Sequence, residues 1–132
     1  MSRNISNIGI QTIDTQHLQL LDKAEAFMQA YKDNLDKDII NSTLNFLESY
    51  VVEHFADEEA LQVSSNYPKY DEHRIMHGSF ITDFAKLKER INENGISHDN
   101  MKYFTDILVK WIINHIDGAD MEFANYYNGI SR

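Results

Sequence analysis

The sequence contains no cysteine, only one proline and five glycines among its 132 residues. Without cysteine the chain can form no disulfide, can hold no metal through a thiolate and has no cysteine nucleophile. Because residues that interrupt regular structure are so few, long helices are favoured over a fold built from many short elements. Any bound metal must then be held by imidazole and carboxylate groups.

Basic runs and long apolar runs are also missing. The formal net charge is −9, and no cluster of lysine and arginine offsets it, so neither nucleic acid nor a membrane is an expected partner. No apolar stretch reaches the length of a membrane span, and residues 1–11 lack the basic-then-apolar layout of a signal peptide. We therefore expect a cytoplasmic protein.

The length and the spacing of apolar residues predict one all-α domain. A chain of 132 residues is long enough for one full core and too short for two. Apolar residues recur at alternating spacings of three and four, which is typical of an antiparallel four-helix bundle in up-down-up-down order. An extended N-terminal arm over residues 1–12 precedes the predicted helices, which span about 14–32, 37–63, 68–92 and 98–127.

Several residues mark the expected helix ends. Asp14 and Ser97 are good N-caps for the first and fourth helices. Pro68 suits the first position of the third helix, where its missing N–H costs nothing. Gly95 follows that helix and predicts a C-cap in the left-handed region.

Two pairs of metal-ligand residues lie at helical spacing in the middle of the chain. His54 and Glu58 are four residues apart, as are His73 and His77, so each pair shares one face of its helix. Both pairs continue stripes that are otherwise apolar. A carboxylate in such a stripe must be compensated, because an unpaired buried charge shifts its pKa or destabilises the fold. A metal cation supplies that compensation.

Five of the six histidines fall on predicted inner faces. A single inward histidine is more often a hydrogen-bonded core residue than a metal ligand. Five from all four helices bring too many ring nitrogens for an apolar core to satisfy, which favours a shared metal site. His98 has polar neighbours and is expected at the surface. The inward set is His17, His54, His73, His77 and His115.

Two acidic residues, Glu58 and Asp120, are candidate ligands for different reasons. Glu58 has acidic neighbours and is singled out only by its spacing from His54, so a solvent-exposed helix face is the alternative. Asp120 follows His115 by five residues, an offset that an ideal helix places well round its axis. We expect the helix to loosen near Asp117 and Gly118 and to turn Asp120 inward.

The number of candidate ligands indicates two metals. One zinc ion would leave several buried polar groups unused, whereas two six-coordinate ions with two bridging carboxylates and a bridging oxide fill about eleven of twelve positions. These ligands suit iron, although manganese and cobalt remain open. So few carboxylates favour reversible dioxygen binding over cleavage. Large apolar residues, Phe55, Trp111 and Ile112, could keep the open position dry, or could simply pack the core.

Four segments together resemble the hemerythrins, in particular the bacterial hemerythrin-like proteins. They are residues 13–17 (IDTQH), 54–59 (HFADEE), 73–77 (HRIMH) and 111–120 (WIINHIDGAD). The resemblance extends from about Gly9 to Asp120. It implies a four-helix bundle with a non-haem, oxo- or hydroxo-bridged diiron centre that binds dioxygen reversibly.

The resemblance also implies a division of the ligands between the two irons. In the hemerythrin pattern the bridging carboxylates correspond to Glu58 and Asp120. The second iron, with two imidazoles, carries the open position. By this pattern one iron is held by His73, His77 and His115, and the other by His17 and His54.

Two positions depart from the family pattern. Ile112 stands where a leucine over the oxygen pocket is frequent, which affects the shape of that pocket. Gln62 stands where a methionine is common, and we expect only a small effect on packing there.

The sequence thus favours an oxygen-binding protein for storage, transport or scavenging rather than an enzyme. Two alternatives stay open at this point. One is an oxygen or redox sensor that acts through a separate partner. The other is a diiron enzyme with peroxidase or nitric-oxide chemistry.

Overall fold

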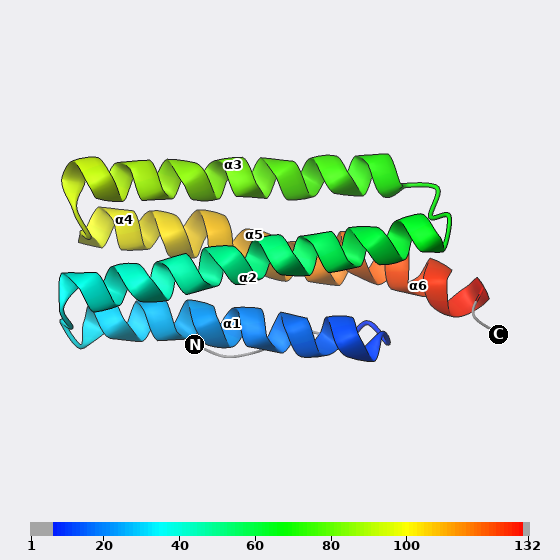
Figure 1. The fold of residues 1–132 in the computed structure, drawn as a ribbon, viewed down its shortest axis with the longest axis horizontal. Coiled ribbons are helices and arrows are strands. Elements are labelled where there is room, and N and C mark those ends of the chain that lie inside the picture. The colour runs from blue at the N-terminus through cyan, green and yellow to red at the C-terminus, as the bar shows by residue number, and fades with distance from the viewer. Residues whose placement is uncertain (1–6, 131–132) are drawn as a thin grey trace.

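The computed structural model describes residues 7–130, which form four antiparallel helical rods and contain no strand (Figure 1). The first three rods are α1 (Gln11–Lys32), α2 (Lys37–Ser64) and α3 (Tyr70–Asn94). The fourth rod is one continuous helix with two π-helical segments, η1 and η2. It comprises α4 (His98–Tyr103), η1 (Phe104–Val109), α5 (Lys110–His115), η2 (Ile116–Asp120) and α6 (Met121–Ile130). The predicted fold is confirmed.

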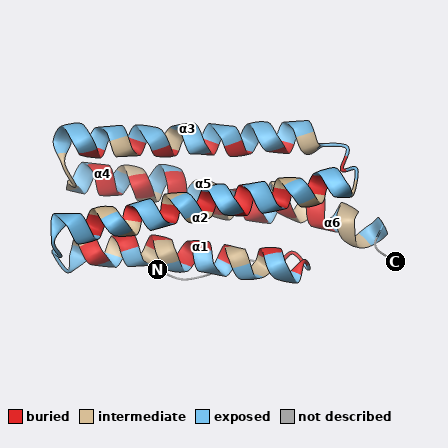
Figure 2. Ribbon diagram, viewed as in Figure 1, coloured by how far each residue is buried: buried red, intermediate tan, exposed pale blue. Residues whose placement is uncertain are grey.

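Each rod buries one stripe against the other three (Figure 2). On α2 this stripe begins with Ile40, Leu44, Leu47 and Val51 and then continues through a histidine and a glutamate. Burial of one such apolar side chain stabilises the fold by roughly 1.5–3 kcal/mol. The polar residues that continue the stripe gain no such stabilisation and therefore need partners inside the core.

The connections are short, and their chemistry matches most of the expected helix ends. Asp36 accepts a hydrogen bond from the Asp38 backbone N–H at 2.8 Å, and Ser97 accepts one from Asn100 N–H at 3.2 Å. Gly95 has a φ of +77°, which glycine adopts without the steric cost that a side chain brings. Its N–H bonds to the Ile91 carbonyl at 2.7 Å and closes α3.

The prediction that Asp14 caps the first helix is wrong, because α1 begins three residues earlier at Gln11. The Asp14 carboxylate instead accepts hydrogen bonds from the backbone N–H groups of Ile8, at 2.7 Å, and Gly9, at 3.2 Å. Ile8 and Ile10 are buried, so this end of the arm packs on the bundle. Residues 1–6 of the predicted arm lie outside the described residues.

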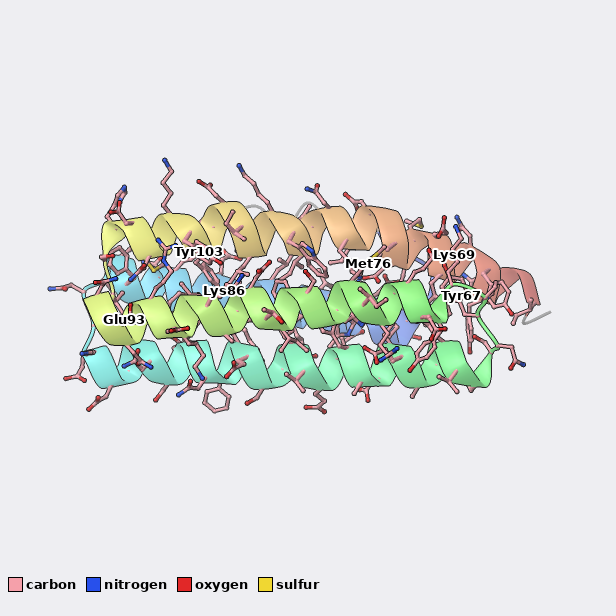
Figure 3. The ribbon with its side chains drawn as sticks, turned by 90° about the horizontal axis from the view of Figure 1, so that it is seen from above. Tyr67, Lys69, Met76, Lys86, Glu93 and Tyr103 are labelled. Carbon is pink, nitrogen blue, oxygen red and sulfur yellow. The ribbon has the colours of Figure 1, made fainter. Side chains whose placement is uncertain are left out.

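The third helix also begins later than predicted, at Tyr70 rather than Pro68. Pro68 lies in the turn that precedes it. This turn is held against α6, where Tyr126 Oη donates to the Ser65 carbonyl at 2.6 Å and Lys69 Nζ lies 3.1 Å from Glu122. Figure 3 shows Lys69 beside Tyr67 at this end of the bundle. The contacts fix how α2, α3 and α6 meet.

The predicted loosening of the last helix is confirmed by η2, whose π-helical turn contains Asp117 and Gly118. A π turn bonds residues five apart, is rare in proteins and frequently occurs at functional sites. The first π-helical segment, η1, was not expected from the sequence. None of the described helices is long and apolar enough to cross a membrane.

Replacement of Asp14 should release the arm from the bundle. In Asp14→Ala two backbone N–H groups lose a charged acceptor, so we expect the free energy of unfolding to fall by about 1–2 kcal/mol. Chemical denaturation measures this loss, and hydrogen exchange should accelerate at the Ile8 and Gly9 amides. Glu89→Ala, at an exposed position of α3, is the control and should leave both unchanged. Equal stability of the two variants would contradict this role of Asp14.

Candidate metal centre

All seven predicted ligands come together inside the bundle. None is more than 8% exposed, the value for His115. Each of the four rods contributes at least one of them, so the site depends on the whole fold. His17 lies on α1, His54 and Glu58 on α2, His73 and His77 on α3, and His115 and Asp120 on the fourth rod. His98 is exposed, as expected.

The candidate ligand atoms form two overlapping groups. Within each group one such atom from every residue lies within 4.8 Å of all the others. The larger group contains His73, His77 and His115, and the smaller contains His17 and His54. Glu58 and Asp120 belong to both, so each carboxylate can offer an oxygen to either side.

Distances in the larger group have the values expected round a single ion. His73 Nε2 lies 2.8 Å from Glu58 Oε1, 2.9 Å from Asp120 Oδ1 and 3.0 Å from His115 Nε2. Two further contacts, from His77 to Glu58 and from His115 to Asp120, are both 3.1 Å. Ligand atoms about 2.1 Å from one ion in octahedral geometry lie about 3.0 Å from their neighbours. The larger group therefore fits a metal ion.

The π turn is what brings Asp120 into the site. In a regular α-helix a residue five positions after His115 would point elsewhere. The wider turn of η2 leaves Asp120 1% exposed, with Oδ1 3.1 Å from His115 Nε2 and Oδ2 3.1 Å from His17 Nε2. This carboxylate thereby links the last rod to α1 and to α3.

Several polar atoms of the cluster lack a partner in hydrogen-bond geometry, although they lie close together. Buried polar groups in proteins are nearly always satisfied, and each exception calls for an explanation. Besides His17 Nδ1 and the side-chain oxygen of Gln62, five of these exceptions converge on one region and can coordinate a cation. They are His17 Nε2, Glu58 Oε1 and Oε2, His77 Nε2 and Asp120 Oδ1.

Burial keeps two of the imidazoles neutral. It lowers the pKa of His54 to about 3, with help from the neighbouring His17, and the pKa of His77 to about 4. A neutral imidazole has one nitrogen with a free lone pair, as metal coordination requires. Both residues can therefore bind a cation at neutral pH without first losing a proton.

The pKa values of His73, Glu58 and Asp120 depend on one another as well as on burial. Burial by itself lowers the pKa of His73, but its contacts with Asp120 and Glu58 outweigh burial and raise the value to about 9. Burial and the negative charge of Asp120 raise the pKa of Glu58 to about 7. Burial also opposes ionisation of Asp120, yet three neighbouring histidines, His115 foremost, hold its pKa well below the usual value.

Three side chains that were not assigned to the site from the sequence contact the outward nitrogens of candidate ligands. His54 Nδ1 lies 2.7 Å from Gln16 Oε1, and Gln16 Nε2 donates to Asp57 at 2.9 Å. His77 Nδ1 lies 2.8 Å from Glu59 Oε2. Such partners orient a metal-bound imidazole and raise its basicity. The contact of Glu59 with His77 depends on how α2 and α3 pack, so helical spacing gave no signal for it.

Gln62 is the third such side chain, and its effect is not limited to the packing expected from the sequence. Its Nε2 atom lies 2.9 Å from His73 Nδ1 in the buried core. Gln62 follows Glu58 by one helical turn on α2, so the same face of the helix carries both.

A small apolar cavity adjoins both histidines of the smaller ligand group, His17 and His54, and is also lined by the shared Asp120 and by His115 of the larger group. Apart from the candidate ligands it is lined by Leu20, Val51, Phe55, Trp111, Ile112 and Ile116. The space that the centre of a water molecule could occupy has a volume of about 10 Å³. This is enough for one very small molecule. The aromatic rings also support the ligands. Phe55 stacks on His77 at 3.8 Å between ring centroids, and Trp111 stacks on His115 at 4.3 Å.

Comparison with known proteins identifies the family. The model of the hemerythrin HHE cation-binding domain matches residues 8–127, which is most of the chain. The chain therefore belongs to the hemerythrin family. Hemerythrins are oxygen-binding proteins with non-haem iron, and the cluster of histidine, glutamate and aspartate side chains fits a metal site of this kind.

Individual hemerythrins are distant in sequence but similar over most of their length. The bacteriohemerythrin of Stenotrophomonas maltophilia (strain R551-3) is 27% identical over 119 residues, which is 90% of this chain and 75% of that protein. The myohemerythrin of Theromyzon tessulatum is 25% identical over 86% of this chain and 87% of its own. A hemerythrin from Sipunculus nudus is 26% identical over 69% of each chain.

The altered pKa values predict how metal affinity depends on pH. A metal must displace the proton of His73 below about pH 9 and that of Glu58 below about pH 7, whereas His54 and His77 are already neutral. Affinity for Co²⁺ should therefore rise as the pH increases from 6 to 9, and loading at pH 7 should release roughly one proton per chain or more. Competition with a chelator and a pH indicator measure the two effects. Affinity that does not change over this range would contradict the proton assignment.

Proposed function

We propose that this hemerythrin binds dioxygen reversibly at two non-haem iron ions, for oxygen storage, transport or scavenging. One observation carries the proposal. Two groups of buried ligand atoms share Glu58 and Asp120, and an apolar cavity lies beside the smaller group. Such an arrangement suits two cations with bridging carboxylates and an unfilled position on one of them.

The proposed ligands divide as the two groups do. His73, His77 and His115 hold one iron, and His17 and His54 hold the other. Three imidazoles on one side and two on the other leave the second iron short of a protein ligand. The cavity lined by His17 and His54 is the space in which dioxygen would be received.

The protein positions the irons, balances part of their charge and excludes water from the cavity. When bound, the irons supply the electrons that reversible dioxygen binding requires. Glu58 and Asp120 balance part of the cationic charge inside the core, where an uncompensated charge is costly. The apolar side chains of Phe55 and Ile112 line the cavity and exclude water, which slows irreversible oxidation.

The geometry of the described residues does not favour the enzymatic alternatives. The cavity is lined by the candidate ligands and apolar side chains, so no further acid or base stands ready to transfer a proton in it. The sensor alternative needs a separate partner protein, whereas the ligand groups and the cavity that support oxygen binding lie within this chain. We accordingly propose a binding protein rather than an enzyme. We also propose that this protein is located in the cytoplasm.

The proposal predicts a specific iron content and a reversible spectrum. Anaerobic loading with ferrous iron should give about two irons per chain, as octahedral coordination by the seven ligands requires. Exposure to air should produce a visible absorption band, and removal of oxygen should abolish it. Iron well below two per chain would contradict the diiron site, and a spectrum that deoxygenation cannot reverse would contradict the carrier function.

The iron content of two histidine variants should distinguish a metal ligand from a surface histidine. His115→Gln removes a ligand of the larger group, so this variant should keep no more than about one iron per chain, because a metal site that loses a ligand binds far more weakly. His98→Gln is the matched control, since His98 is exposed on the same rod, and it should keep about two. Iron analysis after gel filtration measures both. Equal iron in the two variants would contradict the assignment of His115.

Ile112 should control the lifetime of the oxygen-binding form. Ile112→Ala removes buried methyl groups beside the cavity and admits water, so irreversible oxidation in air should accelerate several-fold. Leu108→Ala is the control, because Leu108 is buried one turn earlier on the same rod and does not line the cavity. The decay of the visible band gives both rates. If the Leu108 variant decayed as fast, loss of stability rather than cavity access would explain the result.

A further inference from the structure

Gln62 is a buried amide with an incomplete set of partners. Its side chain is 0% exposed, its Nε2 lies 2.9 Å from His73 Nδ1, and its Oε1 is buried without a hydrogen-bond partner. A buried carbonyl oxygen without a donor destabilises the folded state, because it has lost its hydrogen bonds to water and gained none in return. This residue is polar at a position where a methionine would fill the same space without that cost.

The register of α2 and α3 explains why Gln62 meets His73. The rods are antiparallel, so a step of one turn forward on α2 corresponds to a step of one turn back on α3. Glu59 contacts the outward nitrogen of His77 at 2.8 Å. One turn later on α2, Gln62 contacts the outward nitrogen of His73, one turn earlier on α3. Both histidines of this pair are thus held from α2, one by a carboxylate and the other by an amide.

The inward nitrogen of His73 determines what Gln62 must offer. His73 Nε2 lies 2.8 Å from Glu58 Oε1 and 2.9 Å from Asp120 Oδ1, at the centre of the larger ligand group. If Nε2 gives its lone pair to a metal, the remaining ring proton must be on Nδ1. The partner of Nδ1 must then be an acceptor, and the amide oxygen of Gln62 is the acceptor within reach.

The amide of Gln62 can present that oxygen by a half-turn about its last side-chain bond. Oxygen and nitrogen of an amide occupy nearly equivalent positions, and their assignment follows from the hydrogen-bond network. The half-turn places Oε1 against His73 Nδ1–H and provides the partner that the oxygen otherwise lacks. The same interaction fixes the ring of His73 with Nε2 directed at Glu58 and Asp120.

We infer that Gln62 is a positioning residue of the metal centre, which holds His73 for coordination by accepting its Nδ1–H. The inference rests on the proposed function in one respect, the use of His73 Nε2 as a metal ligand. A neutral amide acceptor also makes the imidazole less electron-rich than a carboxylate acceptor does. Of the histidines assigned to this iron, His77 therefore has a carboxylate partner and His73 an amide partner.

Two substitutions of similar length separate hydrogen bonding from packing. Gln62→Met fills the space but offers His73 no strong acceptor, whereas Gln62→Glu keeps an acceptor oxygen. Leu61→Met, at the preceding and partly buried position, is the control for a methionine on this part of α2. All three full-length variants are compared with the wild type by competition of a chelator for Co²⁺ and by iron content.

Affinity of the Gln62→Met variant for Co²⁺ should fall about tenfold or more, as for other lost partners of metal-bound histidines. The Gln62→Glu variant should bind at least as tightly as the wild type, and its iron centre should have a more negative reduction potential. In the Zn²⁺-loaded protein labelled with ¹⁵N, His73 should show a protonated Nδ1 that exchanges slowly in the wild type and faster in Gln62→Met. The Leu61→Met control should match the wild type in each measurement.

The outcomes distinguish this inference from the proposed function. If the wild type binds about two metals and Gln62→Met binds them as tightly, or if Gln62→Glu loses as much affinity as Gln62→Met, the role of Gln62 is wrong and the metal site stands. An unprotonated Nδ1 of His73 in the Zn²⁺-loaded wild type would also overturn it. If the wild type binds no metal, the proposed function fails and this inference fails with it.

Discussion

The compensation of buried charge is the constraint on which the rest of this structure depends. Two carboxylates and five imidazoles occupy the centre of a largely apolar core, where water cannot solvate them. The pKa of His73 is raised to about 9 by Asp120 and Glu58, and that of Glu58 is raised to about 7 by burial and by Asp120, so protonation lowers the cost of burying these groups together. Metal ions compensate the same groups more completely, because each can accept several lone pairs at once. A bundle of this kind is therefore stabilised at its centre by the metal ions that it binds.

The sequence predicted the rods and the inward placement of the candidate ligands because both follow from helical periodicity. His54 with Glu58 and His73 with His77 are four apart, and the apolar stripe on either side fixes which way they face. Asp120 could be included only by assuming a defect in the helix, and η2 supplies that defect. The assumption succeeded because a spacing of five is wrong for an α-helix and right for a π turn.

What the sequence could not predict depends on contacts between rods. Asp14 has the chemistry of an N-cap, yet it binds the backbone of the arm, since buried Ile8 and Ile10 place that backbone within its reach. Gln62 likewise looked like a packing residue. Its contact with His73 depends on the register between α2 and α3, which no property of α2 alone contains.

The stacking of Trp111 on His115 has a practical consequence. The chain contains one tryptophan, and its ring lies 4.3 Å from the ring of a candidate ligand. The indole is the main source of ultraviolet emission in a protein, and a transition metal held by the adjacent imidazole quenches such emission by energy or electron transfer. Fluorescence of the unlabelled chain therefore reports directly whether this side of the centre is filled, without any added dye.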